Sequence, residues 1–158
     1  MKRILSFLFL ILIFSGCQRQ PMNDMTSKEV SSVIMKSLDE EEFSEMDESY
    51  LGLTFEGMPD LQDASFYGRG NGREEIGILR AKTEADGRAA QASVQDYLEM
   101  QTSALSKQKE LYPSEEAEAA ESYFRNASVG RIGNYVYYFA LDESNRQTAL
   151  AKLQEILK

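Results

Sequence analysis

Two pairs of asparagine and glycine constrain the fold of this chain more than any other feature. Asn71-Gly72 and Gly133-Asn134 each separate two runs rich in β-branched and aromatic residues. The runs are residues 64–70 with 74–82, and residues 123–132 with 134–141. An Asn-Gly pair accepts positive φ at both central positions of a type I′ turn, so such a pair between strand-like runs predicts a β-hairpin. Two hairpins predict an antiparallel sheet of about four strands.

The glycine-rich stretch 68–72, Gly-Arg-Gly-Asn-Gly, has a second interpretation as a phosphate-binding loop. A phosphate loop opens a helix, whose N-terminus then faces the anion. A β-rich run follows here, so the turn is favoured. In that run Ile76 and Ile78 share one face of the strand and Leu79 lies on the other.

Helical patterns precede, separate and follow the two hairpins. Thr26 with Glu29 forms a capping box that starts a helix over residues 27–38, and Ser144 with Gln147 predicts the start of the last helix. The middle helix covers residues 85–108 and stops before Pro113, because proline disfavours helix in the residue before it. The expected inner face of the last helix is Leu150, Leu153 and Leu157. Ser114 with residues 117–120 adds a short helical turn.

The resulting element order is α-β-β-α-β-β-α. It predicts an α+β fold with the helices packed on one face of the sheet. The acidic stretch 39–48 is interpreted as a solvated connector, since it lacks the alternating oxygen ligands and the glycine of a calcium loop.

The second strand of the second predicted hairpin has apolar or aromatic residues on both faces. Its sequence from residue 135 to 141 is Tyr-Val-Tyr-Tyr-Phe-Ala-Leu. Such a strand is either central and covered on both faces or carries an exposed aromatic patch. The first interpretation is favoured. In the second, Tyr135, Tyr137 and Phe139 form a candidate surface for a protein partner, because tyrosine is common at interfaces.

The N-terminus has the pattern of a bacterial lipoprotein. Lys2 and Arg3 precede an apolar run over 4–14, which is too short for the roughly 20 residues of a membrane span. The small residues Ser15 and Gly16 then precede Cys17, in a stretch that resembles a lipobox. We therefore expect a signal peptide over 1–16, acylation of Cys17 with fatty-acid chains such as palmitate, a tether over 17–25 and one domain over 26–158. The expected location is the extracytoplasmic face of the cell membrane, with the lipid as anchor.

The lack of histidine and the presence of only one cysteine exclude several chemistries. The chain has no histidine, and Cys17 is its only cysteine. Ser-His and Cys-His triads therefore have no base, the usual zinc sites have no ligands and no internal disulfide can form. Without Lys2 and Arg3, 15 basic residues remain against 26 acidic ones, a formal charge of −11. A chain this acidic repels phosphate backbones, so we expect no nucleic-acid partner. We expect no metal, no cofactor and no catalytic residue.

Four short features resemble a family of small bacterial lipoproteins that carry a domain of unknown function, DUF4358. They are the lipobox start, residues 74–82 (Glu-Glu-Ile-Gly-Ile-Leu-Arg-Ala-Lys), Tyr112-Pro113, and Gly133-Asn134-Tyr135-Val136 before a closing helix. The resemblance covers most of residues 26–158. It implies a membrane-anchored setting outside the cytoplasm and brings no activity, substrate or site residue.

The function these observations favour is a non-catalytic binding or assembly module at the cell envelope. One alternative is a hydrolase of cell-wall glycans, which would need two carboxyl groups roughly 5–10 Å apart across the scissile bond. Another is a lipoprotein that binds a small ligand between sheet and helices. Arg69, Arg73 and Arg131 near the hairpin turns are candidates for holding an anion, although exposed arginine is usually only a solvated charge.

Overall fold

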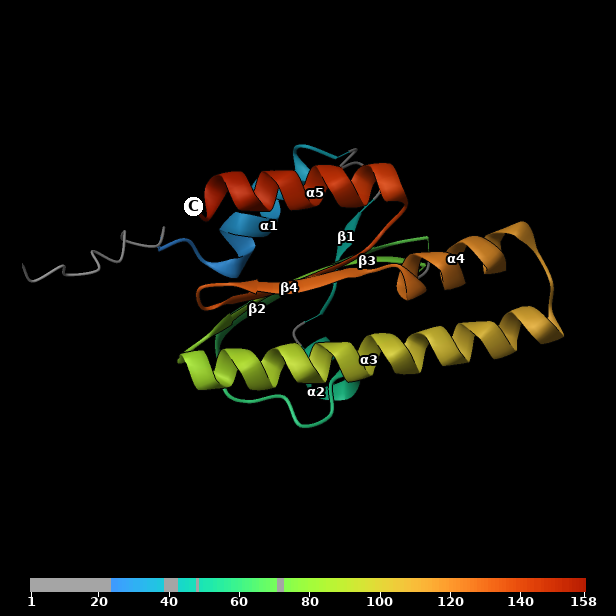
Figure 1. The fold of residues 1–158 in the computed structure, drawn as a ribbon, viewed down its shortest axis with the longest axis horizontal. Coiled ribbons are helices and arrows are strands. Elements are labelled where there is room, and N and C mark those ends of the chain that lie inside the picture. The colour runs from blue at the N-terminus through green and yellow to red at the C-terminus, as the bar shows by residue number, and fades with distance from the viewer. Residues whose placement is uncertain (1–23, 39–42, 48, 71–72) are drawn as a thin grey trace, which may run out of the picture.

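The protein is built on a five-stranded antiparallel sheet with helices on both of its faces (Figure 1). The computed structural model describes residues 24–38, 43–47, 49–70 and 73–158. The helices are α1 Ser27–Met35, α2 Ser49–Thr54, α3 Glu84–Leu111, α4 Glu115–Arg125 and α5 Glu143–Ile156. The strands are β1 Ser44–Glu45, β2 Leu61–Arg69, β3 Glu74–Ala81, β4 Ser128–Ile132 and β5 Tyr135–Ala140. The α+β class and the antiparallel pairing are as the sequence predicted.

The two hairpins form the centre of the sheet, whose strand order is β1-β2-β3-β5-β4. β2 pairs with β3 and β4 pairs with β5, and β3 joins the two hairpins by pairing with β5. Gly133 turns the second hairpin with a φ of 58°, a conformation that glycine adopts at little cost. Asn71-Gly72, the turn predicted for the first hairpin, lies outside the described residues.

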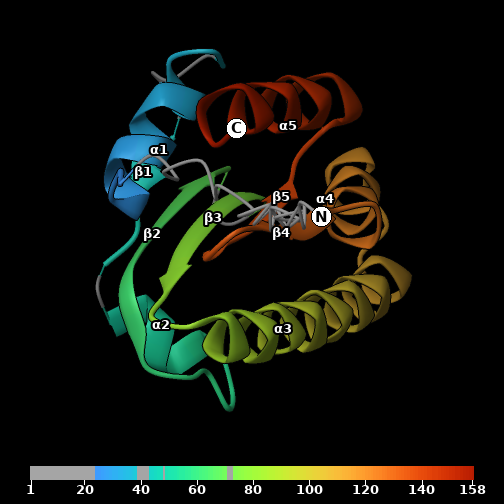
Figure 2. The same cartoon turned by 60° about the vertical axis from the view of Figure 1, so that its left-hand side comes forward.

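The prediction that the helices pack on one face of the sheet is wrong. α1 and α5 cover one face and α3 covers the other, with α2 beside it (Figure 2). The physical reason is that β3 and β5 are apolar on both faces. Ile76 and Ile78 join the core under α1 and α5, whereas Leu79 joins the core against α3, so each face must be shielded from water.

Two short elements were missed between the first helix and the first hairpin. Within the stretch predicted as a solvated connector, Ser44 and Glu45 form β1 and pair with Gly68 and Tyr67 of β2. α2 follows at Ser49–Thr54. A two-residue strand and a six-residue helix are too short to show a hydrophobic period. Residues 39–42 and 48 of that stretch lie outside the described part of the chain.

The boundaries of the first and last helices differ from those predicted. The capping box of Thr26 and Glu29 is present, but α1 ends at Met35 rather than at residue 38. Asp142, not Ser144, caps α5, and its carboxylate accepts a hydrogen bond from the Asn145 backbone N–H at 3.0 Å. Aspartate and serine cap helices equally well, so the sequence alone could not choose between them.

The strand predicted over residues 123–132 begins five residues too early. Ser114 caps a helix that continues to Arg125, and β4 starts only at Ser128. Tyr123 and Phe124 suggested a strand because aromatic residues favour strands. In the fold Phe124 instead points from α4 into the core and is 2% exposed. Burial therefore overrides local preference.

Two residues of the predicted tether contact the folded part of the chain. The carboxylate of Asp24 forms an ion pair with Arg80, and the Tyr135 hydroxyl donates a hydrogen bond to the Met25 carbonyl. The last two residues of the predicted tether are thus held against the body. In the described part of the chain, no helix combines the length and the apolar character needed to cross a membrane.

Candidate functional site

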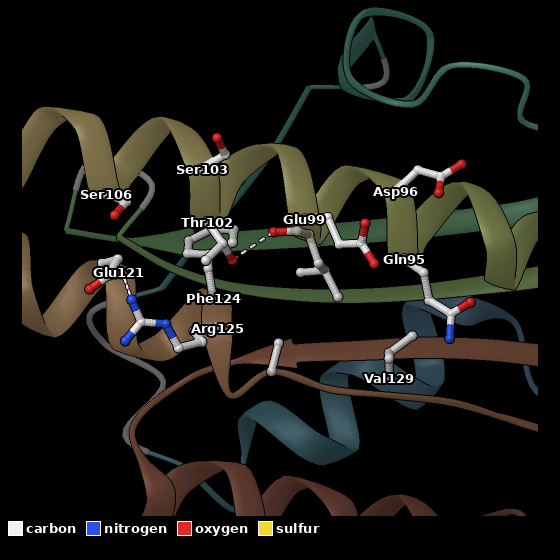
Figure 3. A pocket seen from close by; sticks show the side chains of 12 residues that line it. Gln95, Asp96, Glu99, Thr102, Ser103, Ser106, Glu121, Phe124, Arg125 and Val129 are labelled. Atoms are coloured by element: carbon white, nitrogen blue, oxygen red, sulfur yellow. Dashed lines mark hydrogen bonds and ion pairs between the residues drawn. The ribbon is translucent and has the colours of Figure 1, made fainter.

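A groove of about 770 Å³ lies between α3, α4 and the start of β4 (Figure 3). Leu98, Phe124, Ala127 and Val129 provide apolar surface in this groove. Its polar lining comes from Glu121 and Arg125 of α4 and, on α3, from Gln95, Asp96, Glu99, Thr102, Ser103 and Ser106. The groove therefore combines an apolar contact surface with polar side chains, as a binding surface requires.

The two ends of the groove carry opposite charge. At one end Glu121, which is 1% exposed, forms ion pairs with Lys109 at 2.6 Å and with Arg125. Arg125 is more than half exposed and supplies the positive charge of this end. Asp96 and Glu99 lie towards the other end, where Gln95 is the α3 side chain that reaches towards Val129 (Figure 3), and neither carboxylate makes an ion pair within the described residues.

A second polar cluster lies in the core between β3, β5, α2 and α3. Glu75 is 5% exposed, and its Oε2 is hydrogen-bonded to three tyrosine hydroxyls. The hydroxyl of Tyr97 lies 2.7 Å from this oxygen, that of Tyr50 3.0 Å and that of Tyr138 3.1 Å. The hydroxyls of Tyr50 and Tyr97 also lie 2.8 Å apart. No basic side chain pairs with Glu75 in the described part of the chain.

Counting hydrogens favours a neutral carboxyl at Glu75. The cluster has four hydrogen-bond contacts, but three phenols supply only three hydrogens. A proton on Glu75 supplies the fourth. Burial raises the pKa of Glu75, and the three hydroxyls lower it only in part. Burial and the neighbouring Glu75 also raise the pKa of Tyr97 and of Tyr138, so these phenols keep their protons.

Gly77 makes this cluster sterically possible. It faces Tyr138 across the β3–β5 pair, two residues after Glu75 and on the same side of the sheet. A Cβ at position 77 would overlap the Tyr138 ring and would lie 2.8 Å from its Cζ atom. The absence of a side chain thus lets the ring cross β3 and bring its hydroxyl to Glu75. Phe55 and Phe66 pack around the same group, with ring centroids 5.4 Å apart.

No family model, curated protein or solved structure matches this chain. The resemblance to the lipoprotein family stays a prediction. The chemistry of the groove is therefore inferred from its own residues.

The structure places the sequence-predicted partner residues mostly in the core. Tyr135 is 2% exposed and Phe139 is fully buried, and both belong to the core under α1 and α5. Only Tyr137 is half-buried, with its ring stacked on Phe139 at 5.4 Å. Strand β5 is thus a central, covered strand, which is the interpretation favoured from the sequence. Cys17 lies outside the described residues.

The arginines considered as anion ligands each pair with a glutamate. Arg69 contacts Glu74 at 2.5 Å and Arg73 contacts Glu116 at 2.7 Å. Arg131 lies 3.5 Å from Glu84. These pairs neutralise much of the positive charge that an anion would need. The described residues also contain no group of three acidic or cysteine side chains arranged to hold a metal ion.

The carboxyl group with a raised pKa and the groove are separate features. Glu75 does not line the groove, and the buried Glu121 that does is held by two basic side chains. The geometry therefore gives glycan hydrolysis no specific support. Sequence reasoning missed both features, although one signal was present: Glu75, Gly77 and Leu79 alternate along one face of β3, and a glutamate on a buried face indicates a polar partner.

Proposed function

We propose that this protein is a lipid-anchored, non-catalytic binding module on the extracytoplasmic face of the cell membrane. Its binding site is the groove between α3, α4 and β4. The occupant is a basic segment of a partner protein at the cell envelope. Acylation of Cys17 would hold the module at the membrane, since two or three acyl chains bind durably at about 0.8 kcal/mol per buried methylene.

The observation that carries this proposal is the unpaired acidic charge beside an apolar surface. Asp96 and Glu99 line the same groove as Val129 and have no basic partner among the described residues. The chain as a whole has a formal charge of −9, which attracts a basic partner over distances of about 10 Å at moderate salt. A lysine or arginine of the partner would pair with these carboxylates, while the methylene chain of the same side chain contacts Phe124 and Val129.

The groove is tested with a display library of random peptides. The peptides are about ten residues long, which is the upper end of the usual length of a β-strand. The full-length protein in detergent micelles serves as the target. We expect the selected peptides to be enriched in lysine and arginine. Glu99→Lys, and more strongly Asp96→Lys with Glu99→Lys, should weaken their binding by about tenfold or more, because like charges then face each other.

Glu110→Lys is the matched control. It makes the same charge change on an exposed residue of the same helix, outside the groove. Equal weakening by Glu99→Lys and Glu110→Lys would assign the effect to net charge and contradict a site in the groove. Selection of peptides without basic residues would contradict the proposed chemistry of the partner.

The anchor is tested separately by replacing its only candidate residue. We expect Cys17→Ala to abolish labelling by a fatty-acid analogue and to move the protein from the membrane fraction to the soluble fraction or to block its maturation. The physical reason is that Cys17 carries the only thiol in the chain. Ser15→Ala, which keeps a small residue before the cysteine, should leave labelling unchanged. Wild-type protein that takes up no label would contradict the anchor.

A further inference from the structure

The exposed edge of the sheet lies directly beside the groove. β4 is the last strand in the sheet order and pairs only with β5. In Figure 1 it is the strand nearest the viewer, and no described helix crosses in front of it. Val129 of β4 and Ala127, the residue before the strand, line the groove. An occupant of the groove therefore lies next to an unpaired strand.

The register identifies which backbone groups of β4 point outwards. The Ala81 N–H donates to the Asn134 carbonyl at 2.9 Å, so Asn134 bonds towards β3. The N–H and C=O groups of successive residues in a strand point to alternate sides. The backbone groups of Tyr135 therefore point towards β4, where the register partner of Tyr135 is Ile132. Ile132, Gly130 and Ser128 accordingly bond to β5. The N–H and C=O groups of the two residues between them, Val129 and Arg131, point to the open edge.

We infer that the partner segment binds as an added strand along β4. This inference rests on the proposed function of the groove and specifies the conformation of the occupant. The segment is extended and pairs its main chain with Val129 and Arg131, as in other cases of strand addition to a sheet edge. Exposed strand edges take up such segments because their N–H and C=O groups need partners.

The two faces of the sheet beside β4 also specify which types of side chain the segment carries. On the α3 side, Asp96 and Glu99 belong to the lining of the groove. On the other side, Tyr137 lies over Gly130, where a Cβ would come within 2.8 Å of its ring carbon Cζ. Successive side chains of a strand point to opposite sides. The segment therefore has lysine or arginine at alternate positions and apolar residues between them, with the apolar side chains against Tyr137.

Val129→Pro tests the main-chain pairing with the basic peptides from the display selection as probes. Proline removes the outward N–H of Val129 and leaves the bonds to β5 in place, which edge strands tolerate. We expect peptide binding to weaken by about tenfold or more. The variant loses one hydrogen bond to the peptide, and the proline ring keeps the peptide main chain from approaching β4 closely. Val129→Ala keeps the N–H and is the matched control, for which we expect a smaller loss.

Amide hydrogen exchange on the wild-type protein provides a second readout that needs no variant. Peptide binding should slow exchange at Val129 and Arg131, because their N–H groups become hydrogen-bonded. If Glu99→Lys weakens binding while Val129→Pro and the exchange of both amides do not respond, strand addition is wrong and the groove function stands. If the wild type selects no peptide, the proposed function and this inference both fail.

Discussion

Replacing Gly77 by alanine should destabilise the protein by about 2–4 kcal/mol. The new Cβ would overlap the Tyr138 ring, and Tyr138 is fully buried in the core. Displacing the ring also removes its hydroxyl from Glu75, leaving a buried polar group less well satisfied. The free energy of unfolding from urea denaturation measures the loss.

Gly52→Ala is the control for replacing glycine as such. Gly52 lies in α2, and a Cβ there would meet nothing within 4 Å. Alanine in a helix is favoured over glycine, so this variant should be as stable as wild type or more stable by about 0.5–1 kcal/mol. In a Tyr138→Leu background the cost of Gly77→Ala should shrink, because the ring that it displaces is absent. An undiminished cost would show that the clash with Tyr138 is not the cause.

Glu75→Ala should cost about 2–5 kcal/mol of stability. It leaves the hydroxyls of Tyr50, Tyr97 and Tyr138 without their shared hydrogen-bond partner and opens a cavity among aromatic side chains. Glu75→Gln keeps an acceptor oxygen in place and should cost less. Urea denaturation at one fixed pH compares the two variants with wild type.

The same residue predicts how stability depends on pH. The pKa of Glu75 is raised in the folded protein above the 4.5 of an ordinary glutamate. Above pH 4.5 the unfolded chain loses this proton while the folded chain keeps it, so the folded state binds more protons. The stabilisation from Glu75 is therefore complete below pH 4.5 and is lost as pH rises to the raised pKa, with a slope of at most about 1.4 kcal/mol per pH unit.

Glu75→Gln removes this contribution because an amide does not titrate. The difference in free energy of unfolding between wild type and Glu75→Gln, followed by urea denaturation from acidic to alkaline pH, isolates the effect from that of other groups. We expect the wild type to lose stability relative to the variant as pH rises. Parallel curves would contradict a proton held on Glu75 in the folded state.

Local signals in the sequence predicted the hairpins and most of the helices because their causes are local. Gly133 permits the turn of the second hairpin, and Thr26 with Glu29 forms the capping box of α1. The C-terminal end of α3 also has a local cause, because Pro113 disfavours helix at the residue before it. Where two local signals competed, as with Asp142 and Ser144 at α5, the prediction failed by one or two residues.

The groove depends on contacts between residues far apart in the chain. Phe124 meets Leu98 because α4 folds back along α3, and Val129 joins them because β4 takes the edge of the sheet. No spacing in the sequence encodes that edge position. The strand order β3-β5-β4 is decided by which faces can be buried together, so the site follows from packing and not from a motif.

Taken by itself, the amino-acid sequence determined the α+β class, the two hairpins and the absence of histidine and disulfide chemistry, because turn residues and residue types act locally. The tertiary structure alone decided that helices cover both faces, that Glu75 meets three tyrosines and that β4 is left with an open edge. These features depend on burial and strand order, and both are properties of the whole chain packed together.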